Sequence, residues 1–282
     1  MTTPFPAPSV ARTTAGLAVA GTIALAARRS GSLVPSGAAA AVAVGTVAMS
    51  AGWGWGALLI GFFGSSTALS RWRRDEKARR TGGVVAKGGA RDAAQVLANG
   101  GAFAAAAAAG ALAGRGPRGA ALAGAAAGAL GAAAADTWAT EVGTALGGAP
   151  RLVRGWDPRG WRPAPPGTSG AVTAEGTFGM LAGAAAVALA AGALGLGCAA
   201  AVGAFAGGVA GAAADTLLGA AAQERRWCDA CGEATEQAVH ARCGTPTRTT
   251  GGARGLDNDW VNVLCTLVGA AAGAAAGARV GR

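Results

Sequence analysis

Residues 199–219 read AAAVGAFAGGVAGAAADTLLG and determine the expected fold class. This stretch of 21 residues carries a single charged side chain, Asp215, close to its end. A helix that crosses the hydrocarbon core of a bilayer needs about 20 predominantly apolar residues. The stretch therefore predicts a transmembrane helix. Its Gly203-x3-Gly207 and Gly207-x3-Gly211 spacings are typical of helices whose backbones pack closely in lipid.

Seven further runs are similarly apolar and almost free of charge. Charged residues make up only 13% of the 282 residues, and the mean hydropathy is +0.38. We therefore predict an all-α fold, a polytopic membrane helix bundle of about seven or eight transmembrane helices in a single integral membrane domain, 1–282. The 81 alanines and 50 glycines would also suit a soluble helical protein, but eight such runs favour membrane spans. The runs are roughly 13–27, 33–50, 53–70, 93–113, 119–140, 176–197, 199–219 and 260–278.

The chain is strongly basic, with a formal net charge of +10. If successive loops alternate sides, 19 Lys and Arg fall on one side and 5 on the other. Because loops rich in Lys and Arg stay in the cytoplasm, we predict a multi-pass protein of the cell membrane with cytoplasmic main loops and both termini outside. The net charge then reports topology in a lipid bilayer and calls for no nucleic-acid partner. The predicted cytoplasmic segments are the basic loop 71–92, the loop 147–175 and the loop 221–258.

Acidic residues lie near the predicted cytoplasmic ends of five helices, which predicts a carboxylate-rich pocket facing the cytoplasm. Asp136 and Asp215 each follow an alanine run and lie near a predicted helix C-terminus, where the helix dipole disfavours an anion. Carboxylates within a membrane are costly, so these two are candidates for a functional site. Asp92, Glu175 and Asp257 begin helices and could equally be N-terminal caps.

The segment that ends in Asp136 is repeated at Asp215. Residues 131–137 read GAAAADT and residues 211–216 read GAAADT. Each segment ends the second helix of a predicted hairpin, and the two hairpins begin on the same side of the membrane. The repeat therefore predicts that the two aspartates are counterparts across a pseudo-two-fold axis along the membrane normal.

Amide and hydroxyl side chains share helix faces with several of the acids. Such side chains could line a site or hold neighbouring helices together, and both roles predict that they face inward. The shared faces combine Asp92 with Gln95 and Asn99, Asp136 with Thr140, and Asn258 with Asn262.

One loop carries a metal-ligand pattern, Cys228-x2-Cys231-x8-His240-x2-Cys243, and His240 is the single histidine of the chain. Three thiols and an imidazole within 16 residues are typical of tetrahedral zinc. A reduced cytoplasm makes a disulfide unfavourable there. We therefore predict a structural zinc knuckle in the loop 221–258 without a catalytic role, with unmetallated thiols as the alternative. The other two cysteines fall within predicted spans and are interpreted as small apolar residues, Cys198 and Cys265.

The basic loops have two interpretations. The run from Arg71 to Arg80 is juxtamembrane and suits contact with anionic lipids. Lys87, Arg91 and Arg151 border the predicted acidic pocket and could bind phosphate groups. The sequence has no G-x4-G-K-[ST] motif, which excludes a P-loop nucleotide site.

Five short motifs occur in an order that resembles one integral-membrane family. Over about residues 35–280 the chain is similar to the transmembrane protein 19-like family, also called domain of unknown function 92, which includes the plant phytyl-phosphate kinase. The resemblance implies phosphoryl transfer from a nucleoside triphosphate to an isoprenyl monophosphate. The Cys/His loop resembles a variant of bacterial members, so zinc would be no part of the shared chemistry. The motifs are 94–101 AQVLANGG, 135–141 ADTWATE, 167–170 GTSG followed by Gly176-Thr177, 215–219 DTLLG with Gln223, and 258–262 NDWVN.

The implied reaction suggests a role for each candidate residue. Phosphoryl transfer needs a divalent cation held by carboxylates, and cationic side chains around the transferred group. We expect Asp136, Glu141, Asp215 and Asp259 to be catalytic, and Asp136 and Asp215 to bind Mg²⁺. We expect the isoprenyl phosphate or the nucleotide to contact Lys87, Arg91, Asp92, Gln95, Asn99, Thr140, Arg151, Thr168, Glu175, Gln223, Asn258 and Asn262.

Two other functions compete with this hypothesis. A transporter coupled to cations or protons would also use paired aspartates within the membrane. Transport needs a path to both sides, however, and the outer half of the predicted bundle lacks acids, which favours a one-sided enzyme. The third hypothesis is a structural membrane protein without turnover.

Overall fold

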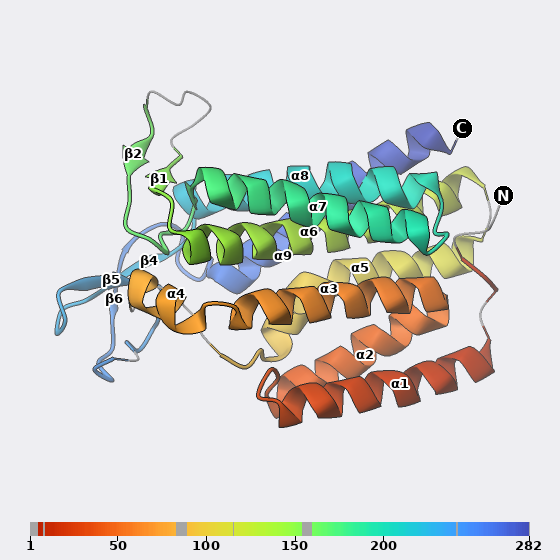
Figure 1. Ribbon diagram of the computed structural model, residues 1–282, viewed down its shortest axis with the longest axis horizontal. Coiled ribbons are helices and arrows are strands. Elements are labelled where there is room, and N and C mark those ends of the chain that lie inside the picture. Colours follow the sequence, from red (N-terminus) through yellow and green to blue (C-terminus); the bar gives the residue numbers. More distant parts are fainter. Residues whose placement is uncertain are drawn as a thin grey trace.

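The computed structural model describes residues 5–7, 9–82, 89–114, 116–153, 160–240 and 242–281. Its long helices lie side by side in a bundle, and each of the eight predicted runs corresponds to one of them (Figure 1). The prediction of an all-α membrane helix bundle is therefore confirmed. The long helices are α1 (Val10–Arg29), α2 (Pro35–Ala51), α3 (Trp53–Arg71), α5 (Ala93–Ala113), α6 (Pro117–Leu146), α7 (Ala174–Ala193), α8 (Cys198–Ala221) and α9 (Asn258–Val280).

Most of these helices meet the requirements of a membrane span. Within the described residues, six are long and apolar enough to cross a bilayer, namely α1, α5, α6, α7, α8 and α9. Helix α2 is a shorter apolar helix of 17 residues. The chain is therefore built as a multi-pass membrane protein whose surroundings are lipid.

Helix α6 lies at the centre of the bundle, where residues 123–135 are all buried against neighbouring helices. Glycines allow the backbones of α6, α8 and α9 to touch. A Cβ added to Gly207 would lie 2.5 Å from the Cα of Gly128, and one added to Gly269 would lie 2.7 Å from the Gly128 carbonyl oxygen. The Gly-x3-Gly spacing of α8 thus predicts its packing, and α9 contributes Gly269-x3-Gly273, which was not predicted.

Helices α1, α2 and α3 form a second group, which lies beside α5 (Figure 1). An aromatic cluster joins this group to α5. The ring of Trp55 stacks on Phe5 with 5.0 Å between centroids, and it meets Phe103 of α5 at 6.2 Å. Because Trp55 and Phe103 are fully buried, the two groups share one core.

Short elements gather at one end of the bundle, which we call the loop end, and both marked ends of the chain lie at the other (Figure 1). Helix α4 follows α3 there, and two antiparallel three-stranded sheets lie in the later loops, with strand orders β2-β1-β3 and β5-β4-β6. These elements are α4 (Arg74–Thr81), β1 (Arg151–Leu152), β2 (Arg162–Pro163), β3 (Ala171–Val172), β4 (Arg225–Cys228), β5 (Glu233–Thr235) and β6 (Arg248–Gly251).

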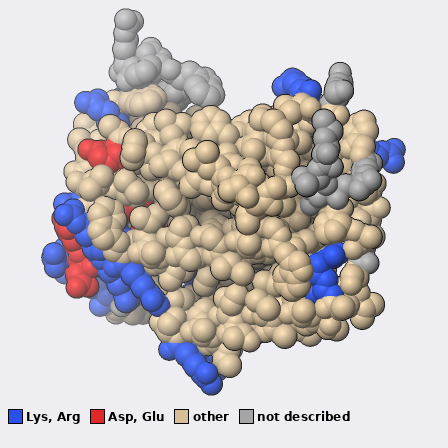
Figure 2. Space-filling model, turned by 45° about the vertical axis from the view of Figure 1, so that its right-hand side comes forward, with Lys and Arg blue, Asp and Glu red and all other residues tan. Residues whose placement is uncertain are grey.

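The charged residues follow the predicted sidedness. The described parts of 71–92, 147–175 and 221–258 all lie at the loop end, so most of the described Lys and Arg gather there. Figure 2 shows charged side chains toward the margins of one face and a broad centre with neither colour, as a lipid-facing surface requires. The side of the membrane that the loop end faces stays a prediction.

Two features of the loop end differ from expectation. Helix α4 lies within the basic segment that was predicted as a loop, and α6 continues to Leu146, ten residues past Asp136, whereas its end was expected near 140. Arg73, the N-cap of α4, and Arg80 within α4 donate to the carbonyl oxygens of residues 144 and 145, so they satisfy the end of the longer helix. Asp136 therefore lies within α6, and the expectation that it sits near a helix C-terminus was wrong.

Candidate functional site

Asp136 of α6 and Asp215 of α8 meet between the two helices. Their carboxyl groups share a hydrogen bond. Gly211, which begins the repeated segment of α8, lets the helices approach, because a Cβ there would lie 2.7 Å from the Cys265 carbonyl oxygen and closer still to Ala132. The structure thus brings together the two acids that the sequence repeat relates to one another.

Helix α9 completes this part of the site. The Cys265 thiol is buried. The negative charge of its ionised form would interact with the charges of both Asp136 and Asp215. Cys265 was interpreted as an apolar residue of a span, and no pattern in the sequence indicated its position beside the acids. Asp259 lies in the first turn of α9 at the loop end with one carboxylate oxygen buried. The remaining predicted residues of this helix are partly buried, Asn258 and Asn262.

Glu141 is bound by a lysine that was not predicted. Lys77 of α4 is only 8% exposed, forms an ion pair with Glu141, and donates to the carbonyl oxygens of Leu69 and Ser70 at the end of α3. The Ser70 hydroxyl donates to the other Glu141 oxygen at 2.5 Å. Glu141 therefore joins α6 to α3 and α4, and a purely catalytic role does not account for these contacts.

Arg91 lies between Glu141 and the apolar interior. Its guanidinium carbon is 5.8 Å from the centre of the Phe63 ring, and Nη1 lies 3.5 Å from the Thr67 hydroxyl. Burial lowers the pKa of Arg91 from its ordinary value, and the charge of Glu141 opposes this shift. Because an arginine stays protonated in proteins, Arg91 presents a partly buried cation here.

An apolar pocket lies between α1, α2, α3 and α5. Its walls are mainly alanine, glycine, and larger aliphatic and aromatic side chains, and four polar residues contribute to its loop-end half. Thr137 directly follows Asp136, so the polar part of the pocket and the paired aspartates meet the same turn of α6. A pocket with long apolar walls and a few polar groups suits an amphiphilic ligand. The polar residues are Arg91, Gln95, Asn99 and Thr137.

Two of the predicted binding residues also form the start of α5. Asp92 and Gln95 make a reciprocal capping box. The backbone N–H of Gln95 donates to the Asp92 carboxylate at 3.0 Å, and the backbone N–H of Asp92 donates to the side-chain oxygen of Gln95 at 3.2 Å. Asn99 donates to the Gln95 carbonyl oxygen at 2.9 Å. Asp92 therefore acts as the N-terminal cap of α5, which was one of its two predicted roles. Gln95 and Asn99 also line the pocket.

Other predicted residues lie at the loop end without reaching the paired acids through a described contact. Asp257 caps α9, whereas Glu175 lies in the first turn of α7, which Thr173 caps. Thr140 of α6 and Arg151 of β1 are exposed. Lys87 lies outside the described residues.

The turn 167–170 packs against the end of α8. A Cβ added to Gly219 would lie 2.8 Å from the Gly170 nitrogen, and the Thr168 hydroxyl donates to a carbonyl oxygen three residues earlier at 2.8 Å. Nearby, Gln223 is 2% exposed, and its side-chain nitrogen has no hydrogen-bond partner among the described residues. Two motifs that are separate in the sequence, 167–170 and 215–219, therefore meet here.

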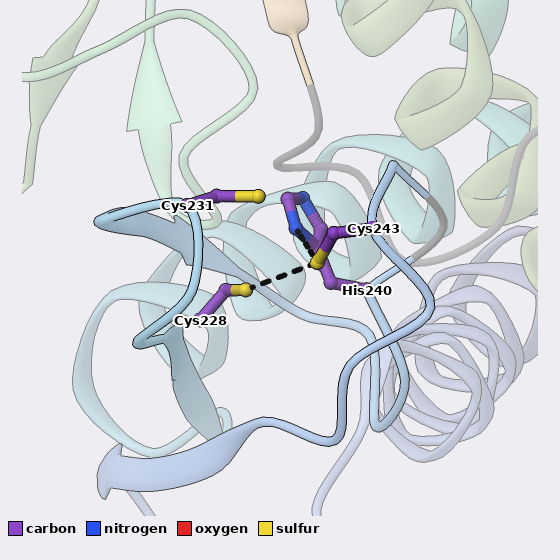
Figure 3. Close-up of side chains that lie close together, drawn as sticks. All are labelled: Cys228, Cys231, His240 and Cys243. Carbon is purple, nitrogen blue, oxygen red and sulfur yellow. Dashed lines mark hydrogen bonds between the residues drawn. The ribbon is translucent and has the colours of Figure 1, made fainter.

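The predicted metal ligands converge in a second cluster, within the segment 224–255 that we call the Cys/His module. The ligand atoms of Cys228, Cys231, His240 and Cys243 all lie within 4.8 Å of one another, and their side chains point toward a common centre (Figure 3). The Cys243 sulfur lies 3.5 Å from both the Cys228 sulfur and His240 Nδ1. Sulfur ligands about 2.3 Å from a tetrahedral zinc ion would be about 3.8 Å apart, so the cluster can hold such a metal.

Local structure prepares these ligands. Gly232 and Gly244 each follow a ligating cysteine and adopt positive φ values of 66° and 69°, which lets the chain turn back around the cluster. Hydrogen bonds from Thr245 lower the pKa of the Cys243 thiol to about 6, whereas the hydrogen bond with Cys243 raises the pKa of Cys231 to about 11, so Cys243 is the thiol that ionises most readily. A thiolate is the form that binds metal, and the donor set therefore fits Zn²⁺.

Comparison with known proteins adds one match to this geometry. Residues 18–270 match a family model described as integral membrane protein DUF92. No solved structure matches the chain significantly.

Proposed function

Because this chain belongs to the integral membrane protein family DUF92, we propose that it is a membrane-embedded phosphotransferase that transfers phosphate from a nucleoside triphosphate to an isoprenyl monophosphate. The observation that carries the proposal is the juxtaposition of an apolar pocket, a partly buried arginine and a pair of aspartates. The pocket offers walls for an isoprenyl tail, and its polar residue Thr137 lies next to Asp136 on the same turn of α6.

Arg91 is the residue best placed to hold the monophosphate of the acceptor. Its side chain lines the pocket wall, and the charge of Glu141 attracts its guanidinium. These two neighbours together orient Arg91. An arginine binds phosphate oxygens with two parallel hydrogen bonds. Gln95 and Asn99 line the same part of the pocket and would contribute neutral amides.

Asp136 and Asp215 are the residues that would hold Mg²⁺. Two adjacent carboxyl groups would suit the ion once the proton of their hydrogen bond has left to solvent, because magnesium sites use one or two carboxylates together with substrate phosphates. When bound, the ion would neutralise phosphate charge as it develops during transfer. The bond that forms joins an oxygen of the isoprenyl phosphate to the γ-phosphorus, and the bond between that phosphorus and the β–γ bridging oxygen breaks, which releases a nucleoside diphosphate.

Packing beyond the acids supports an enzyme over a transporter. Residues 123–135 of α6 are all buried, and glycines of α8 and α9 contact them backbone to backbone. A transport path from the aspartates toward the opposite end would have to separate these contacts. The loop end, in contrast, offers the polar groups that a nucleotide requires.

The test is nucleoside diphosphate release by the protein in lipid nanodiscs, with Mg²⁺, a nucleoside triphosphate and geranylgeranyl monophosphate. We expect release to depend on the isoprenyl phosphate and to fall at least about 100-fold in D136N and in D215N, because each substitution removes charge stabilisation of the transferred group. D229N is the matched control, since Asp229 is exposed and pairs with Arg248 on the surface of the Cys/His module. Wild-type release rates in both D136N and D215N would contradict the assignment.

A further inference from the structure

The Cys/His module contacts the bundle beside the candidate site. The Ser169 hydroxyl donates to the carboxylate of Glu236, which follows β5 within the module. The charge of Glu236 also interacts with that of Asp215. A loop that merely folds around its own metal needs neither contact, so the module reaches the site through Glu236.

The metal ligands hold Glu236 from both sides. It lies five residues after Cys231 and four before His240, so both chain segments that lead to it are fixed by the cluster. Strand β5 pairs with β4 immediately before Glu236, and the Thr247 hydroxyl donates at 2.5 Å to the carbonyl oxygen of Gln237 immediately after it. The cluster, the strand pairing and the Thr247 hydrogen bond together set the position of Glu236.

Ser169 is in turn fixed to the helix that carries Asp215. The next residue is Gly170, and a Cβ added to it would lie 2.2 Å from the Ala220 nitrogen. A Cβ added to Gly219 would lie 2.8 Å from the Gly170 nitrogen. Ser169 also follows Thr168, which was predicted to contact substrate. A contact at Ser169 consequently acts on both the turn 167–170 and the end of α8.

We propose that Glu236 is a positioning residue that holds the turn 167–170 against α8, and that metal in the Cys/His module keeps it there. The effect that this contact should have on the rate of phosphoryl transfer rests on the proposed function. Because Glu236 acts through a hydrogen bond to Ser169, removal of either partner should release the turn. Loss of the metal should release it as well.

The first test measures the turn directly. Hydrogen–deuterium exchange of peptides covering 165–173 should rise in E236A, in S169A and in wild-type protein after zinc chelation. It should stay at the wild-type level in E236Q, because a glutamine oxygen still accepts the Ser169 hydroxyl. E233A is the matched control, since Glu233 lies three residues earlier and pairs with exposed Arg242. Zinc content by mass spectrometry should be unchanged in E236A. Unchanged exchange in both E236A and the chelated protein would overturn the proposal.

The second test measures phosphoryl transfer. We expect kcat/KM to fall about tenfold in E236A and in S169A, with near-wild-type values in E236Q. The double variant and chelated E236A should be no worse than E236A alone, because each change removes the same contact. Additive losses would overturn the proposal. If neither the wild-type protein nor any variant transfers phosphate, the proposed function fails. The exchange measurement still decides whether Glu236 holds the turn 167–170.

Discussion

At the scale of single residues, the candidate site depends on glycines as much as on acids. Asp136 and Asp215 can meet because α6 and α8 approach closely, and Gly211 sits where any side chain would strike its neighbours. The same close approach recurs toward the opposite end at Gly128, Gly207 and Gly269. Helices in lipid gain little from hydrophobic association, so these backbone contacts position the carboxylates.

Replacing Gly128 by alanine should therefore destabilise the bundle. The added Cβ would lie 2.9 Å from the Cα of Gly273 and nearer still to the Gly269 carbonyl oxygen, and backbone atoms cannot rotate away. We expect G128A to lose about 1–3 kcal/mol of stability, the usual cost of overpacking, measured as a lower thermal unfolding midpoint in detergent. G101A is the control, because a Cβ at Gly101 meets nothing within 4 Å. Equal midpoints for G128A and G101A would contradict this account.

Residue-level prediction from sequence succeeded where a local pattern carried the information. The repeated GAAAADT and GAAADT segments related Asp136 to Asp215, and the cysteine spacing identified four side chains that converge in a cluster able to hold a metal. Lys77 and Glu236 were missed because their partners, Glu141 and Ser169, lie 64 and 67 residues away along the chain. Lys77 lies in a basic run and Glu236 in a polar loop, and neither context predicts a contact with a residue so far away along the chain.

At the scale of elements, short structures at the loop end connect the long helices. Helix α4 and its N-cap bind the ends of α3 and α6 through Lys77, Arg80 and the N-cap residue Arg73. The helices themselves were predictable from uncharged runs, because bilayer thickness fixes their length. Helix α4 and the two small sheets were not, since their strands have two to four residues and their stability comes from tertiary contacts.

The Cys/His module is closed at its base by Glu224. The Thr249 hydroxyl donates to its carboxylate at 2.5 Å, the Gly255 amide donates at 2.9 Å, and Arg226 pairs with it. The Thr249 hydrogen bond, followed by the Gly255 amide, lowers the pKa of Glu224 below its ordinary value, and the charge of Arg226 acts in the same direction. A carboxylate with a lowered pKa stabilises the folded state at neutral pH, and this stabilisation disappears as the pH falls through its folded pKa.

The glutamine variant E224Q should therefore unfold at a lower temperature than wild type at pH 7. The difference in midpoint should shrink as the pH falls below the ordinary glutamate value near 4.5, because wild type then loses the same charge. Thermal unfolding of both proteins across this pH range measures the difference, with E233Q as a control for a half-buried glutamate whose ion pair partner Arg242 is exposed. A difference that stays constant from pH 7 down to acid would exclude the proposed role of the charge.

At the scale of the whole molecule, charge is distributed between two ends and is scarce in the middle. The described loops rich in Lys and Arg share the loop end, and the marked chain ends lie at the other (Figure 1). This arrangement agrees with the 19-to-5 division of basic residues in the sequence. The candidate acids and the polar part of the apolar pocket lie toward the loop end, which the charge rule assigns to the cytoplasm.

This orientation predicts the behaviour of fusion proteins. A C-terminal reporter enzyme that works only outside the cytoplasm should be active, whereas a reporter that fluoresces only in the cytoplasm should be dark. A reporter inserted after Arg79, on the exposed surface of α4, should show the reverse pattern. Cytoplasmic fluorescence at the C-terminus would place the loop end outside and would remove the nucleotide's access to the candidate site.

The central claim is that the paired aspartates and the adjoining pocket phosphorylate an isoprenyl monophosphate. Mass spectrometry of the lipid products tests it most directly, with purified protein, Mg²⁺, a nucleoside triphosphate carrying an isotopically labelled γ-phosphate, and phytyl or geranylgeranyl monophosphate. We predict an isoprenyl diphosphate that carries the label, formed by wild type and lost in D136N and D215N. If a verified isoprenyl-phosphate kinase forms this product under the same conditions and the wild-type chain does not, the claim is contradicted.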